Sequence, residues 1–178
     1  MRNGGLLAIL LLFAPALGPR GEIRRVGGVV DGLGDGQDVV FVEAAIRGCA
    51  TMARRAEGDP LDRIGKTVEN DLRDYCCGEV FEGGCFFFNS LVELSGQSPE
   101  MSGRIVEGFM QFADLLASWL EEAKAAGQLK PGVRIKEVAD FIVTSINGAA
   151  ALYVATRDNR FPRAIERQLN AYIQTLRA

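Results

Sequence analysis

The widest hydrophobic arc in the chain lies near its C-terminal end, in residues 138–157. At about 100° per residue, its polar positions fall on one narrow strip with a neighbouring alanine: Asp140, Thr144, Asn147 and Ala151. The rest of this predicted helix is apolar or small, so it must be covered on more than one side. Gly148 and the alanines after it permit another helix to approach closely. The pattern predicts a central helix that is buried by its own bundle and has a face for a second subunit.

Capping signals divide the rest of the chain into further helices. Asp59-Pro60 and Ser98-Pro99-Glu100 each place a capping side chain directly before a proline, which is the usual start of a helix. The second helix carries an apolar stripe: Leu61, Ile64, Val68, Leu72 and Tyr75. Predicted helices cover residues 41–58, 60–78, 85–94, 98–127 and 138–157, and a last one starts at 162. The expected fold class is therefore all-α, a bundle of about six helices.

Residues 1–40 do not continue this pattern. A short apolar run, Leu6–Phe13, follows Arg2 and precedes Ala14-Pro15-Ala16, which is the outline of a secretory signal peptide. Residues 18–38 are rich in glycine, which predicts loop or disorder. We expect two parts, a poorly structured segment over 1–40 and a helical domain over 41–178.

Composition excludes several kinds of chemistry. The chain has 178 residues, a formal net charge of -3 and no histidine. Without histidine there is no Ser-His or Cys-His nucleophile pair and no His-ligated metal site. Cys49, Cys76, Cys77 and Cys85 lack CxxC spacing and are typical of thiols packed on helices. We therefore expect no catalytic residues, no metal and no cofactor, so the protein is not expected to be an enzyme.

Several stretches together resemble a known family. GGCFFFNSLVELSGQSPEM (83–101), FADLLASWLEEAKAAGQLKPG (112–132) and VADFIVTSINGAAALYVATRD (138–158) resemble the C-terminal domain of TetR/AcrR-family transcriptional regulators. FVEAAIR (41–47) resembles the helix that connects this domain to the DNA-binding domain. The resemblance extends from Phe41 to Arg177. It implies an all-helical, cytoplasmic, homodimeric domain in which a bound effector shifts the spacing of two DNA-reading heads.

The resemblance also implies a helix-turn-helix domain before Phe41, and the sequence departs from it there. Residues 1–40 show no amphipathic three-helix pattern, and they carry four basic and four acidic residues. A segment of zero net charge is a poor surface for binding phosphates. Leu12–Ala14 resembles the end of the family's first helix. Residues near 15–40 are dominated by Gly, Val, Arg and Asp, which is the mixture expected when GC-rich DNA is translated out of frame. Operator DNA is thus expected as a partner only of an intact helix-turn-helix.

Two functions fit these patterns. One is the effector-sensing and dimerisation domain of a TetR-type repressor that does not bind DNA specifically as written. The other is an exported helical binding protein that uses Leu6–Phe13 as its signal peptide and has no regulatory role. No membrane partner is expected in either case.

Two sets of site residues follow from the periodicity and the resemblance. The last two helices are expected to pair with their copies in a second subunit as a four-helix interface. Its predicted residues are Phe141, Thr144, Gly148, Leu152, Ala155, Ile165, Leu169, Tyr172 and Ile173. An uncharged, mainly apolar effector is expected between the long helix and the central helix. Its predicted lining is Phe86, Phe109, Phe112, Leu116, Ile142, Ile146 and Tyr153.

Overall fold

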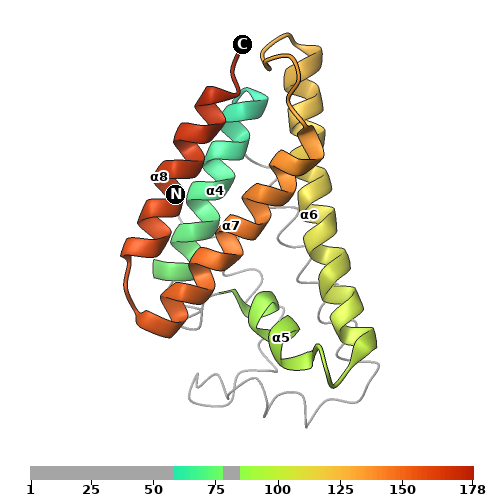
Figure 1. Cartoon of the computed structure of the whole chain (residues 1–178), viewed down its shortest axis with the longest axis vertical. Coiled ribbons are helices and arrows are strands. Elements are labelled where there is room, and N and C mark those ends of the chain that lie inside the picture. Colours follow the sequence, from blue (N-terminus) through green and yellow to red (C-terminus); the bar gives the residue numbers. More distant parts are fainter. Residues whose placement is uncertain (1–57, 78–84) are drawn as a thin grey trace. The chain divides into compact units, whose positions relative to one another are not determined.

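The structure is a computed structural model that describes residues 58–77 and 85–178, without the side chains of residues 74–77 and 86. Five helices follow one another in this part of the chain (Figure 1): α4 (Pro60–Cys77), α5 (Phe86–Leu94), α6 (Pro99–Ala125), α7 (Ile135–Thr156) and α8 (Arg160–Thr175). The predicted all-α class is confirmed. The predicted first helix, the boundary at residue 40 and the signal-like run lie outside the described residues.

The predicted capping residues act as expected. The Asp59 carboxylate accepts hydrogen bonds from the backbone N–H groups of Leu61 and Asp62, at 2.9 and 3.0 Å. At the start of α6, the Ser98 side chain accepts one from Met101 N at 3.4 Å. Each contact satisfies an N–H group that has no partner within its own helix. The starts of α4 and α6 therefore lie where the sequence predicted them.

Two helix starts differ from the prediction by a few residues. Helix α7 begins at Ile135, three residues before the predicted Val138. The sequence gives no signal for this start, because Arg134 occupies the cap position and provides no side-chain cap. Helix α8 begins at Arg160, ahead of Pro162. Proline is tolerated there because the first N–H groups of a helix have no intrahelical acceptor.

Helix α7 crosses the bundle between the α4–α8 pair and α6 (Figure 1), and it contacts all four other helices. Nine of its residues are buried: Ile135, Val138, Ala139, Ile142, Val143, Ile146, Asn147, Ala149 and Ala150. The prediction of a central helix buried by its own bundle is confirmed. On α4, the stripe of Leu61, Ile64, Val68 and Leu72 is at most 1% exposed.

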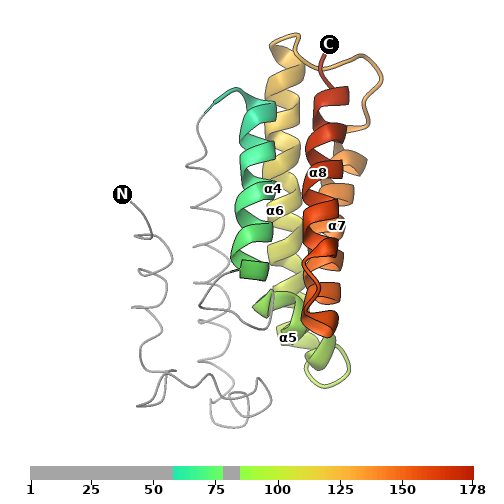
Figure 2. The same cartoon turned by 90° about the vertical axis from the view of Figure 1, so that its left-hand side faces the viewer.

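Within residues 58–77 and 85–178, α7 is the one helix long and apolar enough to span a membrane by length and composition. Core helices of water-soluble proteins meet the same criterion, and α7 packs against α4, α5, α6 and α8, lying behind α8 in the view of Figure 2.

The last three residues of the chain bond to both the α6–α7 connection and the start of α4. Lys130 N donates to Leu176 O and Ala178 N donates to Gln128 O, both at 2.9 Å, around an antiparallel bridge between Leu129 and Arg177. The Arg177 guanidinium then reaches Asp59, at 3.1 and 3.2 Å, and also Asp62. Its hydrogen bond to Asp59 lowers the pKa of that carboxyl, against the opposing effect of burial.

Replacing the arginine tests this tie. We expect Arg177→Gln to lower the free energy of unfolding at neutral pH by about 1 kcal/mol, since the pair is partly shielded from solvent. Because the pKa of Asp59 is lowered in the folded state, this contribution is present at neutral pH and is lost as the pH falls through that lowered pKa. Urea denaturation across acidic pH measures it.

Asp59→Asn is the matched variant, because asparagine keeps the helix cap and removes the charge. In that background the cost of Arg177→Gln should shrink. An equal cost in both backgrounds, or at every pH, contradicts the assignment.

Candidate functional site

One stripe along α7 is left uncovered by the rest of the bundle. Phe141 and Leu152 are 51% and 46% exposed, although both are large and apolar. The small or polar residues between and beyond them, Thr144, Gly148 and Ala155, are also exposed. A Cβ atom added at Gly148 would meet no atom within 4 Å, so the protomer leaves open space there. All five predicted interface residues of α7 therefore share one exposed face.

The predicted interface residues of α8 divide into two groups. Tyr172 and Ile165 are partly exposed, and the Tyr172 ring meets Phe141 edge to face with centroids 5.4 Å apart. Leu169 and Ile173 are only 2% and 1% exposed. Since they are buried within the protomer, these two residues support the exposed face rather than belong to it.

The residues predicted to line an effector site come from α5, α6 and α7, and the structure buries three of them. Leu116, Ile142 and Ile146 are at most 1% exposed, whereas Phe109, Phe112 and Tyr153 are partly exposed. Phe86 opens α5, and its side chain is outside the described part. The two helices that carry most of this set pack against each other.

Three buried polar side chains interrupt the apolar interior. Thr67 on α4, Ser90 on α5 and Asn147 on α7 are 3%, 3% and 7% exposed. The Thr67 and Ser90 hydroxyl oxygens and Asn147 Oδ1 meet no hydrogen-bond partner within the described ranges. Asn147 Nδ2 does donate to Val143 O, at 2.9 Å. Asn147 was predicted on a polar strip, but Thr67 and Ser90 were not predicted as buried polar residues, because each has a polar neighbour, Lys66 or Asn89, as an exposed residue would.

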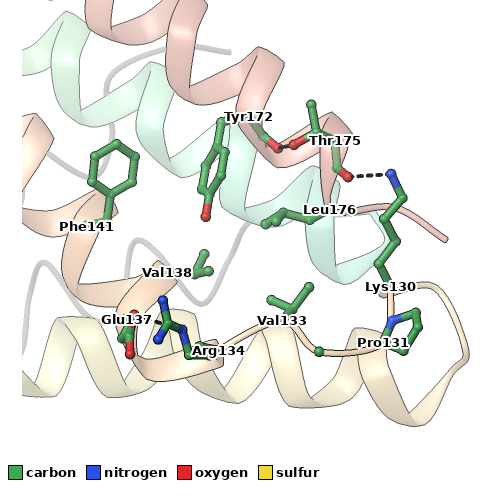
Figure 3. A pocket seen from close by; sticks show the side chains of 11 residues that line it. Lys130, Pro131, Val133, Arg134, Glu137, Val138, Phe141, Tyr172, Thr175 and Leu176 are labelled. Atoms are coloured by element: carbon green, nitrogen blue, oxygen red, sulfur yellow. Dashed lines mark hydrogen bonds and ion pairs between the residues drawn. The ribbon is translucent and has the colours of Figure 1, made fainter.

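A pocket of about 470 Å³ lies elsewhere, where the α6–α7 connection meets the end of α8 (Figure 3). Two basic residues, an acid, two aromatic rings and several apolar side chains line it: Lys130, Pro131, Gly132, Val133, Arg134, Glu137, Val138, Phe141, Tyr172, Thr175 and Leu176. None of the predicted effector residues lines this pocket. No site was predicted between the helices expected at 98–127 and 138–157, because the pocket forms only when the C-terminal residues pack beside this connection.

A second apolar patch lies on the outer side of α6. Val106 and Met110, one turn apart, are 41% and 62% exposed. Like the α7 stripe, it carries two exposed large apolar side chains, so it is an alternative surface for a partner.

The comparisons with known proteins identify the domain. The family described as "Tetracyclin repressor-like, C-terminal domain" matches residues 60–169, which is more than half of the chain. The chain belongs to this family. The resemblance seen in the sequence is thereby confirmed, and the described part is a TetR-family ligand-binding domain. No curated protein matches the sequence.

Solved structures of TetR-family regulators share the fold. A regulator from Chloroflexus aurantiacus superposes with a TM-score of 0.70 at 17% identity, covering 78% of this chain and 70% of that one. One from Cytophaga hutchinsonii gives 0.67 at 14% identity, with 100% and 98% covered. Reduced E. coli NemR gives 0.66 at 17% identity, with 98% and 95% covered. At such identities the likeness shows the fold alone.

The unpaired Thr67 hydroxyl in this TetR-like domain leads to a prediction. Thr67→Val keeps the shape and removes a buried group without a partner, so we expect the ligand-free protein to gain about 1 kcal/mol of stability. Thr175→Val is the matched control, because the Thr175 hydroxyl is exposed and already donates to Tyr172 O. Chemical denaturation measures the free energy of unfolding of both variants, and only Thr67→Val should gain stability. A loss of stability in Thr67→Val means that its hydroxyl has a partner in the folded protein.

Proposed function

We propose that the chain is the effector-sensing and dimerisation part of a TetR-type repressor, and that it acts as a homodimer in the cytoplasm. The observation that carries the proposal is the exposed stripe on α7, a helix that is otherwise buried in the bundle. Cell fractionation tests the location, since export with cleavage after the Leu6–Phe13 run would contradict it.

Burial of this stripe supplies the driving force for dimerisation. Phe141 and Leu152 are each about half exposed, so covering the remainder contributes about 1 kcal/mol per side chain. A twofold axis places the same patch on both subunits, and every such contact counts twice. Gly148 lies between the two large side chains on the stripe and offers no side chain of its own, so the partner's helix is able to approach closely there.

Introducing a charge at this glycine should separate the subunits. We expect Gly148→Glu to convert the dimer to a folded monomer, because a Glu side chain has room in the protomer but would be buried without a partner in the dimer. Gly103→Glu is the matched control, since a Cβ at Gly103 on α6 also meets no atom within 4 Å. Sedimentation velocity should show a monomer for the first and a dimer for the second. A soluble, dimeric Gly148→Glu protein would remove this face from the interface.

The effector is proposed to bind between α6 and α7 and to be uncharged and mainly apolar. The buried side chains there include Leu116, Ile142 and Ile146, and the partly exposed Phe112 lies on α6 one turn before Leu116. No charged residue is buried in residues 58–77 or 85–178, apart from those whose side chains are undescribed. An ionised ligand would therefore lack a counter-charge in this interior and would lose its hydration. The unpaired Asn147 Oδ1 offers a neutral ligand one hydrogen-bond acceptor.

A truncation on α6 tests the effector site. A thermal-shift screen with a library of neutral hydrophobic compounds should find a ligand. For this compound, Phe112→Ala should weaken binding by more than tenfold, as expected for a lost aromatic contact of about 2 kcal/mol. Met110→Ala, on the exposed side of the same helix, should leave affinity unchanged. Equal losses in both variants, or no ligand in the library, would contradict an effector site between these helices.

The last element of the proposal is that this chain does not bind operator DNA specifically. It rests on the sequence of residues 1–40, whose balanced charge and lack of helical periodicity do not predict a helix for a major groove. We infer a shifted reading frame or a decayed gene in this region. In a mobility-shift assay, the chain should bind the DNA upstream of its gene no better than unrelated DNA. Specific binding, or no helix-turn-helix pattern in either other frame of the gene, would refute the inference.

A further inference from the structure

We propose that the pocket between the α6–α7 connection and the end of α8 is a second ligand site, which takes a small aryl carboxylate. This site goes beyond the proposed interior effector site and shares no residue with it, whereas Phe141 and Tyr172 belong both to the pocket lining and to the proposed dimer face. It also differs in the charge of its ligand, because the interior favours a neutral compound. The inference does not depend on the existence of the interior site.

Hydrogen bonds from Lys130 to backbone oxygens connect the two walls of this pocket. One wall is the connection after α6, and the opposite wall is the last turn of α8 (Figure 3). Lys130 N donates to Leu176 O, and Lys130 Nζ donates to Thr175 O, both at 2.9 Å. A ligand would therefore meet walls that are already ordered, which lowers the entropic cost of binding.

The charges on the rim favour an anionic group. Lys130 keeps donor capacity beyond its one contact with Thr175 O, because an ammonium carries three N–H groups. Arg134 Nε lies 3.0 Å from Glu137 Oε2, which occupies one edge of the guanidinium and leaves its remaining N–H groups to a ligand. With two cations and one acid, the lining carries a net charge of +1.

The start of α7 adds a weaker contribution of the same sign. Arg134 occupies its cap position, and no side chain caps the first turn. The first N–H groups of a helix have no intrahelical acceptor and form the positive end of its dipole. They accompany the two cations and do not make the site alone.

The remaining lining suits a planar apolar body. Val133, Val138 and Leu176 are aliphatic, and Phe141 and Tyr172 form an edge-to-face pair with an interplanar angle of 79°. In Figure 3 the two rings lie on one side of the pocket, across from Arg134 and Glu137. A ring on the ligand would extend this aromatic cluster while its carboxylate reaches the cations.

Size and charge together exclude larger anions. A volume of about 470 Å³ is within the usual range of small-molecule sites. Two rim cations in a chain of net charge -3 provide little attraction for a polyanion such as nucleic acid. The chemistry thus selects a compound with one negative group and one or two rings.

The test uses the full chain with 2-naphthoate as the probe and 2-naphthamide as its neutral analogue. Calorimetry measures affinity, and amide chemical shifts of ¹⁵N-labelled protein locate the bound compound. We expect 2-naphthoate to bind about tenfold more tightly than the amide, as a charge-assisted hydrogen bond would give. The largest shifts should lie in residues 130–141 and 172–176.

Charge variants then assign the carboxylate. Arg134→Gln should weaken 2-naphthoate about tenfold, and Glu137→Gln should tighten it a few-fold because it removes a like charge and frees the guanidinium. Lys136→Gln and Asp140→Asn change exposed residues of the same helix that do not line the pocket, and they should change affinity by less than about twofold. Tighter binding by Glu137→Gln is a gain that misfolding cannot produce.

Three results would overturn the proposal. The first is no binding of 2-naphthoate at millimolar concentration, and the second is equal affinity for acid and amide. The third is a set of shifts centred on α6 and the buried face of α7 instead of the connection, which would place the compound in the interior site. In that last case the proposed effector site would stand and the second site would fall.

Discussion

The burial of α7 is the constraint on which the rest of this domain depends. Its apolar arc is too wide for one neighbour, so α4, α6 and α8 surround it and α5 closes against one end. The short tail after α8 completes the arrangement, because Arg177 ties the last helix to the cap of α4 through Asp59. Removing solvent from this one helix therefore sets the positions of the others.

The same constraint explains where function is expected. The bundle covers α7 except along the stripe of Phe141, Thr144, Gly148, Leu152 and Ala155, which leaves apolar surface available to a second copy. Inside, the close packing of aliphatic side chains leaves Asn147 Oδ1 without a partner. The stripe and the buried amide lie on different faces of one helix. A ligand that displaces α7 from the inside would therefore also displace the residues of the proposed interface.

Much of the fold could be predicted from local signals. Asp59-Pro60 and Ser98-Pro99 mark helix starts through capping chemistry, and the 138–157 pattern identifies the buried helix through its period. The start of α7 was missed because Arg134 is no capping residue. Periodicity places Leu169, Tyr172 and Ile173 on one apolar face of α8 and does not show which of them are buried. Leu169 and Ile173 lie in the core, whereas Tyr172 lies at the edge of this face and is partly exposed. The pocket beside Lys130 could not be predicted, because residues more than forty positions apart form it.

Two copies of the chain are proposed to meet along the stripe of α7. Intermolecular nuclear Overhauser effects in a mixed dimer, with one subunit labelled at leucine, valine and methionine methyl groups, test it most directly. The Leu152 methyl groups should show contacts to the unlabelled partner, and Val106 and Met110 on α6 should show none. A dimer whose intersubunit contacts arise from Val106 and Met110, with Leu152 silent, would contradict it.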